Sequence, residues 1–566
     1  MRSQKFWNWL EGFGLVAVVC VGFWLRWLYM YNNVGNPNEI DFGGDPSHHY
    51  HIAQNIYRGV GPFTDFIFSY WFRHPDLPAM TDVYPPGYHY LLAGVFHIFG
   101  PGVEVARWVS LLLGSLVPLL TFGLARHLSG ERSPAPLLAA ALVALNAHQV
   151  EYSALVMTPV VVCFWFLLAL YLILWSCQSR ALTRWCLAGV VSGVAALTQG
   201  AGPALFVTGV VAVLASLGTG ALNRTQALRA LSSFVACYFF LQAPWGYMTH
   251  QYFGSAFFSV GSFYPLTTAW TLMNSETTAP SFAAFAEGRD WVEHFGKILN
   301  YVWRALSGQS EMIALPAFPK PVSSGWMFFA LVPFLSSSKL FVRRILAAIF
   351  CLGVVGMMAL ASYAMQWSIH PRHYFAVTAI FGIFATQGLW SFIRRGFGLI
   401  RHGAIRLWIP RFVVLVALVV FAHVAQRSLT SVSRMGGSFW SIEFDEFKEL
   451  CRWIDKNTAP TARIFYASTP QDLSQQCRRQ VVIDPSFGPS RSMARENRRI
   501  VEEMKFYGVE YLLVDRSDRV YDRKFLALEK IPEIYFPLRL IPLFEDARAG
   551  LHFYRIEAPL ADPKEH

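Results

Sequence analysis

Seven carboxylates lie between residues 31 and 104, a stretch that holds only two basic residues. A carboxylate can take the proton from a hydroxyl while that hydroxyl attacks an electrophilic carbon. We expect Asp45 to be such a general base, with Asp41 able to exchange roles with it. The competing interpretation of Asp45 is a helix N-cap, because Asp-Pro-Ser before a helical stretch is a common helix start.

Three histidines follow Asp45 closely, at positions 48, 49 and 51. Adjacent histidines on a helix point to different faces, so only His48 and His51 share one. Two ligands on one face make a weak metal site, and a solvated interfacial face is the simpler interpretation. We therefore expect no metal or other cofactor, with a divalent metal as the unsupported alternative, and we assign His49 to substrate binding.

Two arginines stand near the outer ends of apolar stretches, Arg107 and Arg372. A phosphate leaving group needs nearby positive charge rather than a strong acid, and these side chains could supply it. A charge at such a place is costly unless it reaches the interface or meets a partner. Reaching the interface is the alternative interpretation of both.

Aromatic residues make up 16% of the chain. Most of them are explained by the aromatic belts of a membrane protein, and Trp245 could belong to such a belt. We nevertheless expect Tyr50 and Tyr84 to shape a pocket beside the base and Trp245 to contact substrate.

The elements that position these residues follow from the composition. Hydrophobic residues make up 54% of the 566 residues and charged residues only 15%, whereas soluble proteins are about a quarter charged. Apolar runs recur at 137–145, 160–175 and 412–424. A bilayer needs about 20 apolar residues per helix. We expect a polytopic α-helical membrane protein with about 11 transmembrane helices, the first near residues 9–30.

Loop charges set the orientation. With the N-terminus in the cytoplasm, the cytoplasmic segments hold 16 Lys and Arg residues and the outside segments only seven. This bias is what the positive-inside rule expects, and a shift by one helix would destroy it. The outside segments are 31–104, 148–157, 248–322 and 364–373. The net charge of +11 is explained by cytoplasmic anchoring, so we expect no nucleic-acid partner.

The chain divides into a membrane module, residues 1–426, and an extracytoplasmic tail, residues 427–566. The module carries two long outside loops, 31–104 and 248–322. The apolar stretch after Pro85 and Pro86 is too short to span, so we expect juxtamembrane helices at the outer face. In the tail, a periodic segment at 442–457, a charged helical stretch at 488–507 and β-type runs at 463–467, 481–483 and 511–514 predict a small α/β domain.

Six of the eight cysteines lie in or beside predicted spans, where a thiol packs as a small apolar side chain. Cys451 and Cys477 share the tail. In an oxidising compartment they could pair, although sequence does not show whether their Cα atoms are close enough.

Five landmarks together resemble the GT-C glycosyltransferases of the protein-mannosyltransferase and aminoarabinose-transferase superfamily. They are GDPSHHYHIAQNIYRGVG at 44–61, YPPGY at 84–88 with Arg107 after it, APW at 243–245 with YFG at 252–254, RHY at 372–374, and the tail from Trp453 to VEYLLVD at 509–515. They occur in order along nearly the whole chain. Each motif alone is weakly specific, whereas the ordered set is fairly specific.

The resemblance implies an inverting glycosyltransferase that takes a sugar from a polyprenyl-phosphate carrier at the outer face, with Asp45 as the base. The acceptor would be a glycan, a lipid or a protein. Two departures affect contacts with the donor head group. Relatives often carry an acidic residue at the place that here reads VMTP at 156–159, with Glu151 several residues earlier, and a basic residue near Gln199.

Two other classes of function stay open. A transporter or flippase of a lipid-linked sugar would share the groove and the basic residues, but its working polar groups would sit at mid-membrane. A catalytically degenerate sensor or scaffold would act through the tail. The tail holds no recognisable extra sugar-binding module, which disfavours a eukaryotic protein mannosyltransferase, so we expect a multi-pass protein of the bacterial inner membrane.

Overall fold

The structure is a computed structural model. The described residues are 2–32, 45–67, 74, 76–81, 84–129, 133–254, 256, 329–335, 340–365, 371–398, 445–466, 470–483, 504–515, 539–546 and 551–557. They fall into two compact units. The helical unit comprises Met1–Glu39, Asp82–Leu266 and Ser281–Ser438. The sheet unit comprises Ile40–Thr81, Thr267–Pro280 and Phe439–His566.

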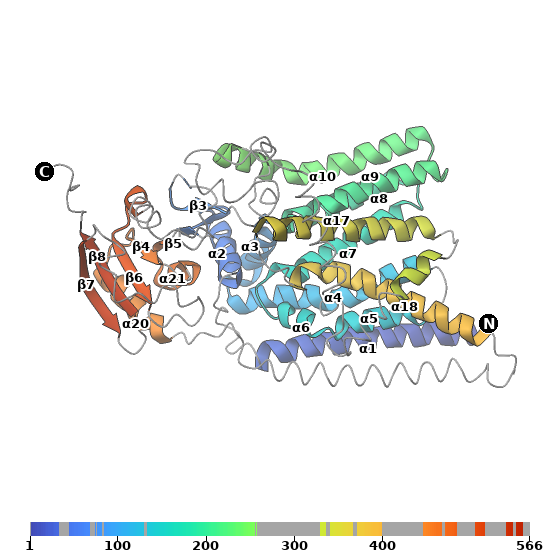
Figure 1. Ribbon diagram of the computed structural model, residues 1–566, viewed down its shortest axis with the longest axis horizontal. Coiled ribbons are helices and arrows are strands. Elements are labelled where there is room, and N and C mark those ends of the chain that lie inside the picture. The colour runs from blue at the N-terminus through green and yellow to red at the C-terminus, as the bar shows by residue number, and fades with distance from the viewer. Residues whose placement is uncertain are drawn as a thin grey trace. The chain divides into compact units, whose positions relative to one another are not determined.

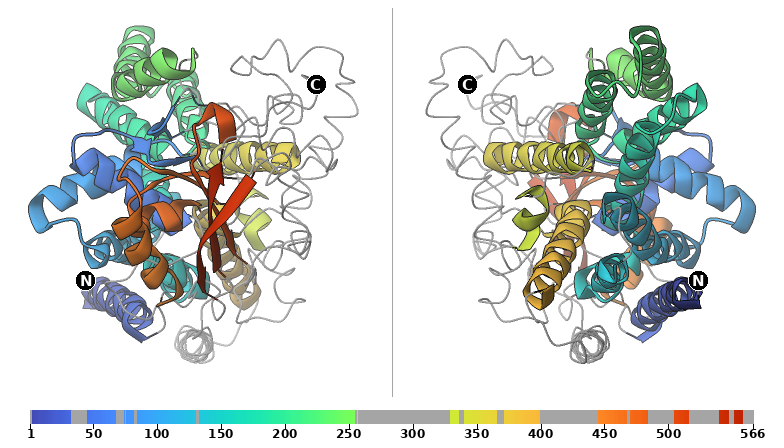
Figure 2. Two further views of the ribbon diagram at one scale, coloured as in Figure 1. Left: turned by 90° about the vertical axis from the view of Figure 1, so that its left-hand side faces the viewer. Right: turned by 90° about the vertical axis from the view of Figure 1, so that its right-hand side faces the viewer.

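The helical unit is a bundle whose helices run side by side (Figures 1 and 2). Its described elements are α1 (Arg2–Asn32), α3 (Gly87–Phe99), α4 (Val103–Ser129), α5 (Ala135–Ala144), α6 (Ala147–Ser153), α7 (Thr158–Ser176), α8 (Leu182–Thr198), α9 (Pro203–Gly218), α10 (Arg224–Phe253), η3 (Val332–Leu335), α17 (Phe341–Met365), η4 (Pro371–Tyr374) and α18 (Phe375–Gly398). Local sequence sets several ends. Pro86 precedes α3, and a capping box between Asn223 and Gln226 begins α10.

Five helices among the described residues are long and apolar enough to cross a membrane. They are Glu11–Asn32, Val103–Ser129, Thr158–Ser176, Phe341–Met358 and Arg372–Arg395. The helices α5, α8 and α9 are apolar but shorter. The chain therefore has the helical membrane architecture that its composition predicts. The count of about 11 spans stays a prediction, and the run at 412–424 lies outside the described residues.

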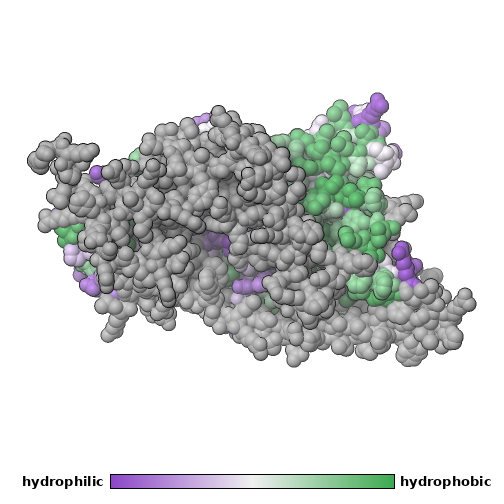
Figure 3. All heavy atoms as spheres, viewed as in Figure 1, coloured by the Kyte–Doolittle hydropathy of each residue, from purple (hydrophilic) through white to green (hydrophobic). Residues whose placement is uncertain are grey.

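Apolar side chains cover the outer surface of α8, α9 and α10. Figure 3 shows them gathered over this part of the bundle. Exposed residues there include Val207, Leu214, Leu228 and Phe240. A surface of this kind suits contact with lipid.

The helices α8 and α10 approach each other closely at two glycines of α8. A Cβ added at Gly193 would lie 3.0 Å from the carbonyl oxygen of Tyr238, and one at Gly189 would collide with that of Phe234. Gln242 then donates a hydrogen bond of 2.7 Å to the carbonyl of Gly193. Small residues let helix backbones pack tightly in a bilayer, so these glycines set the spacing of the pair.

A fully buried arginine on α1 joins three elements. The guanidinium of Arg26 donates to Gly22 O at 2.8 Å, to Ala144 O at 3.1 Å and to Ser153 Oγ at 3.1 Å. Ala144 ends α5 and Ser153 ends α6. Carbonyl groups at a helix C-terminus carry partial negative charge, which stabilises the buried cation.

Among its described residues, the sheet unit is built around a mixed sheet of six strands, in the order β2-β5-β4-β6-β8-β7. Its elements are α2 (Asp45–Tyr57), β1 (Phe63–Thr64), β2 (Phe66–Ile67), β3 (Ala79–Met80), α20 (Asp445–Asn457), β4 (Arg463–Tyr466), α21 (Pro470–Cys477), β5 (Gln480–Ile483), β6 (Tyr511–Asp515), β7 (Arg539–Asp546) and β8 (Leu551–Glu557). The first four strands in this order run parallel to one another. The strand β8 is antiparallel to both of its neighbours, β6 and β7.

Side chains alternate between the two faces of this sheet, as a strand requires. On β4, Ile464 and Tyr466 join a core with α20 and α21, whereas Phe465 joins a second core with Met504 and Tyr507. The strands β4, β5 and β6 and the helix α20 lie where the sequence predicts a strand or a helix. Most of the predicted helical stretch at 488–507 lies outside the described residues.

The first outside segment is divided differently from the prediction. The sequence assigns all of 31–104 to the membrane module, whereas Ile40–Thr81 groups with the tail. The reason is main-chain pairing, because β2 lies parallel to β5 with Phe66 opposite Val481. Arg463 Nη2 also forms an ion pair of 2.8 Å with Asp76. The middle of the predicted loop, Ile40–Thr81, is thus part of the sheet unit.

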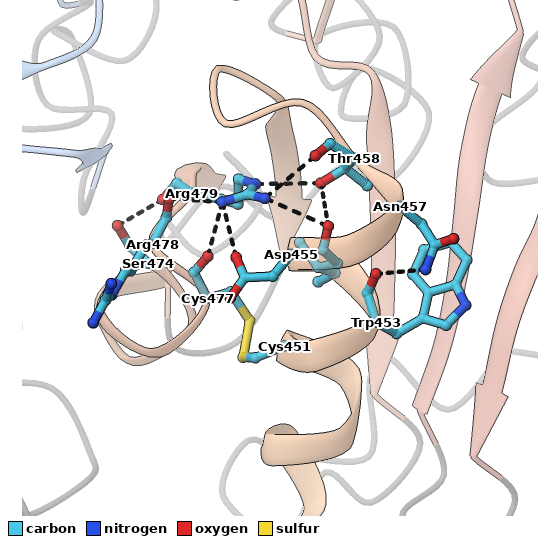
Figure 4. A network of polar contacts seen from close by, with 10 residues as sticks. Cys451, Trp453, Asp455, Asn457, Thr458, Ser474, Cys477, Arg478 and Arg479 are labelled. Carbon is cyan, nitrogen blue, oxygen red and sulfur yellow. Dashed lines mark hydrogen bonds and ion pairs between the residues drawn. A yellow bond between two sulfur atoms is a disulfide. The ribbon is translucent and has the colours of Figure 1, made fainter.

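A disulfide and a buried arginine join α20 to α21. Cys451 and Cys477 are bonded, with their Cα atoms 4.6 Å apart. Arg479 lies just beyond, where its guanidinium contacts Asp455 Oδ1 at 3.1 Å and the carbonyls of Cys477 and Ile454 (Figure 4). This network fixes α21 against α20.

Candidate functional site

Asp45 is the first residue of α2 and is half-buried. An acidic side chain in the first turn of a helix interacts favourably with the helix dipole. Asp45 thus stands at the start of the helix, as expected from its sequence context, and its role as a general base stays a prediction. Asp41 lies outside the described residues.

The three histidines of α2 are buried, with His48, His49 and His51 each no more than 5% exposed. The expectation of a solvated face is therefore wrong. The physical reason is that α2 packs against α21 and β1 within the sheet unit. The ring of Phe66 contacts His48 and His51 edge-on, with centroids 5.0 and 5.2 Å apart.

His51 is held by polar contacts from the strand side. Its Nε2 lies 3.1 Å from Asp65 Oδ2 and 3.2 Å from the backbone nitrogen of Asp65. The amide of Asn55 is 3.2 Å from the same nitrogen and donates to Phe63 O at 2.9 Å. The side chains of α2 that face β1 and β2 are thus tied to those strands.

The pKa of the Asp65 carboxyl is shifted. Burial alone would raise the pKa of its carboxyl, but hydrogen bonds with His51 and Asn55 and the charges of His51 and Arg58 hold that pKa below its ordinary value. Asp65 therefore stays a carboxylate at neutral pH.

Tyr50 is also buried on α2. Burial raises the pKa of its hydroxyl, and a hydrogen bond with Gln54 and the charge of Arg58 offset this only in part. Tyr50 therefore keeps its proton at neutral pH and can donate a hydrogen bond.

In the helical unit, Arg107 is fully buried on α4, one turn before Ser110. Ser110 Oγ lies 2.9 Å from the hydroxyl of Tyr88 on α3. Tyr84 is half-buried just before the start of α3. Arg107 and the residues around Tyr84 thus belong to neighbouring elements, because α3 packs on α4.

A second group of polar residues lies where α6 packs on η4. On α6, Glu151 Oε2 is 3.5 Å from His148 Nδ1. On η4, Arg372 and His373 are half-buried, and His373 Nδ1 is 3.4 Å from Gln199 Nε2. Arg372 is the more accessible of the two predicted arginines, so it is better placed to meet an anion.

Trp245 is buried on α10, whereas Tyr247 two residues later is 66% exposed. The aromatic-belt interpretation therefore fits Tyr247 better than Trp245.

Three residues near the candidate positions were not selected from sequence: Asp65, His148 and His373. A histidine one turn before Glu151 and another beside Arg372 are visible as spacing signals. Asp65 carries no such signal, because its partner is 14 residues away along an irregular segment. Within the described residues, no group of three or more His, Cys, Asp or Glu side chains is placed to hold a metal ion.

The sequence of residues 83–247 matches the family model of the dolichyl-phosphate-mannose-protein mannosyltransferases. The match runs from just before α3 into α10, and it includes Tyr84, Arg107, Glu151 and Trp245. No curated protein sequence matches the chain.

Solved structures resemble the chain over nearly its full length. The archaeal oligosaccharyltransferase AglB from Archaeoglobus fulgidus, in complex with an inhibitory peptide and a dolichol-phosphate, matches with a TM-score of 0.60 at 16% identity, over 96% of this chain and 74% of AglB. ArnT from Cupriavidus metallidurans, bound to undecaprenyl phosphate, matches with a TM-score of 0.54 at 16% identity, over 97% of this chain and 98% of ArnT. The chain has the GT-C fold.

A third protein with the GT-C fold, the arabinofuranosyltransferase AftD from Mycobacteria, matches with a TM-score of 0.54 at 12% identity, over 96% of this chain and 41% of AftD. The GT-C resemblance that the sequence motifs indicate is thereby confirmed. At these identities the likeness concerns the fold, and the roles of single residues have to be argued from their chemistry.

Proposed function

We propose that this GT-C protein transfers a sugar from a polyprenyl-phosphate carrier to an acceptor hydroxyl at the outer face of a membrane. The observation that carries the proposal is the full-length likeness to the structure of ArnT bound to undecaprenyl phosphate. The match covers 97% of this chain and 98% of ArnT. The family-model match over residues 83–247 adds independent support.

In the proposed reaction, Asp45 accepts the proton of the acceptor hydroxyl. The hydroxyl oxygen forms a bond to the anomeric carbon, while the bond from that carbon to the phosphate oxygen breaks. The polyprenyl phosphate leaves with the electron pair. A single displacement of this kind inverts the anomeric centre. Asp41 is the alternative candidate for the general base.

The leaving phosphate needs positive charge rather than a proton. We propose Arg372 as the main phosphate contact, because it is only partly buried, with the fully buried Arg107 as the second. Tyr50 keeps its proton and is proposed to donate to an oxygen of the substrate. We assign contacts with the sugar or the carrier to His49, Tyr84, Glu151 and Trp245.

No step of this reaction requires a metal or another cofactor. We therefore expect turnover to persist in EDTA. We propose the bacterial inner membrane as the location, with the N-terminus in the cytoplasm and the tail outside, as the loop charges indicate.

The first test is turnover by purified protein with a panel of radiolabelled polyprenyl-phosphate sugars, comparing wild type with Asp45→Asn. We expect sugar-dependent transfer or slow donor hydrolysis in the wild type, and a loss of about 10²- to 10⁴-fold in the variant, the usual range for a general base. Asp41→Asn measured in parallel decides between the two carboxylates. Tight donor binding without turnover, equal in all three proteins, would instead favour a transporter or sensor.

A further inference from the structure

We propose that His51 and Asp65 are positioning residues, which transmit the geometry of the tail's sheet to α2 and so fix the place of Asp45. This inference rests on the proposed role of Asp45 as the base. All contacts involved lie within the sheet unit.

The first link joins the sheet to Asp65. The carbonyl of Asp65 accepts the backbone N–H of Val481 on β5 at 3.0 Å, immediately before β2 pairs with the same strand. Ser474 Oγ on α21 lies 3.5 Å from this carbonyl and donates to Arg479 O at 2.8 Å. The main chain at Asp65 is thus fixed by two elements of the tail.

The second link joins Asp65 to α2. One ring nitrogen of His51 faces both the backbone N–H and the carboxylate of Asp65, at 3.2 and 3.1 Å. A neutral ring nitrogen can accept the N–H, and a protonated one can donate to the carboxylate. His51 thus joins α2 to the residue that immediately precedes β2.

The third link is α2 itself, a helix of 13 residues that begins at Asp45. His51 lies in its middle and is 5% exposed. A short helix is marginal on its own, so its direction is set by what it packs against. The His51–Asp65 contact and the packing of α2 on α21 together define that direction.

The consequence is specific to catalysis. A base acts only within hydrogen-bond reach of the proton that it abstracts, and a misplacement of about 1 Å can cost about 10²-fold in rate. Loosening α2 should therefore lower kcat, whereas contacts with the donor that do not involve α2 should be retained.

The test compares Asp65→Ala and His51→Ala with a matched control, Asp76→Ala. Asp76 also connects the first outside segment to the tail, through its ion pair with Arg463, but its side chain is 66% exposed. We expect the first two variants to lose about 10- to 100-fold in kcat, with a smaller change in the donor KM, because the proposed phosphate contacts Arg372 and Arg107 lie outside α2. Asp76→Ala should keep both constants within about twofold. The conservative His51→Gln should recover part of the rate.

A second measurement needs no turnover. Hydrogen exchange of the α2 amides should accelerate about tenfold or more in Asp65→Ala, while α21 and β5 keep the protection of the wild type. Retention of the Cys451–Cys477 bond and of the melting temperature, within a few degrees, shows that the variant is folded. If Asp65→Ala is unfolded, the same comparison is made with Asp65→Asn.

The outcomes separate this inference from the proposed function. Unchanged kcat in Asp65→Ala and His51→Ala, with Asp45→Asn inactive, overturns the positioning role and leaves the proposed base intact. Equal losses in Asp65→Ala and Asp76→Ala also overturn it, because the effect is then general. Full activity of Asp45→Asn refutes the proposed base itself, whatever the exchange rates of α2.

Discussion

Arg26 in the helical unit and Arg479 in the sheet unit are both buried and both join separate elements, yet their partners differ. The guanidinium of Arg26 donates hydrogen bonds to two carbonyls and a serine hydroxyl. Arg479 contacts several carbonyls and also the carboxylate of Asp455. Among the described residues, the buried guanidinium of Arg26 is thus held by neutral oxygens.

The difference is explained by the free energy needed to desolvate a carboxylate. A carboxylate beside Arg26 would have to be desolvated as well, which costs several kcal/mol. Carbonyls at the end of a helix are already desolvated and need donors. Asp455 is 55% exposed, so water still solvates it and its pairing adds little. The comparison predicts that the neutral contacts dominate in both units.

The largest effect is expected from Arg26→Ala. The change leaves a cavity and removes the donors to Ala144 O and Ser153 Oγ, which should cost about 3–5 kcal/mol. Thermal unfolding in detergent measures it. The control is Arg184→Ala, whose guanidinium stacks on Trp175 at 3.8 Å near the surface and should be worth about 1 kcal/mol or less. Equal losses in the two variants would contradict the comparison.

The next effect is loss of the disulfide. Cys451 and Cys477 are 26 residues apart, and closing a loop of this length stabilises a fold by about 3–4 kcal/mol. The double serine variant should lose this amount in denaturant unfolding of the sheet unit. Wild type in reductant should behave like the variant; a difference between them would show that the serines themselves disturb the site.

A smaller effect is expected at Arg479. Replacement by Lys keeps the charge but loses the planar fork that reaches several carbonyls, at a cost of about 1–2 kcal/mol. Asp455→Asn removes the charged partner and should cost less than about 1 kcal/mol. The two variants, measured by the same unfolding experiment, sharpen the comparison. A larger loss in Asp455→Asn would mean that the ion pair dominates.

The smallest effect is the pH dependence from Asp65. Its pKa is lower in the folded state than its ordinary value of 3.8, so its contribution is present above that value. The contribution is lost as the pH falls from about 3.8 through the lowered folded pKa. Asp65→Asn should flatten this part of the curve of unfolding free energy against pH. If the variant shows the same loss of unfolding free energy at acidic pH as the wild type, the loss does not come from Asp65.

The helical architecture could be predicted because apolar runs and ordered motifs are local signals. The run at 160–175 falls within α7, and the paired prolines directly precede α3. Cys451 and Cys477 could be proposed as a pair because both lie in the tail. Whether they form a disulfide depends on how α20 packs against α21, which the sequence does not show. The number of spans and the orientation stay predictions.

The division of the first outside segment could not be predicted. The strand β2 has two residues, which is too short for a periodic pattern, and its partner lies far along the chain. The burial of His48, His49 and His51 depends on the same pairing. The sequence around these histidines is polar and aromatic, and nothing local shows that α21 covers them.

The pairing of β2 with the tail has a consequence for biosynthesis. Ser474 and Asp65, which contact each other, are 409 residues apart. At roughly 5–20 residues per second, a ribosome needs about 20–80 s to make the intervening chain. During that time α2 is already outside the ribosome while its sheet does not yet exist. The nascent protein therefore carries an unsatisfied strand and three uncovered histidines, and its folding depends on whatever shields them until translation ends.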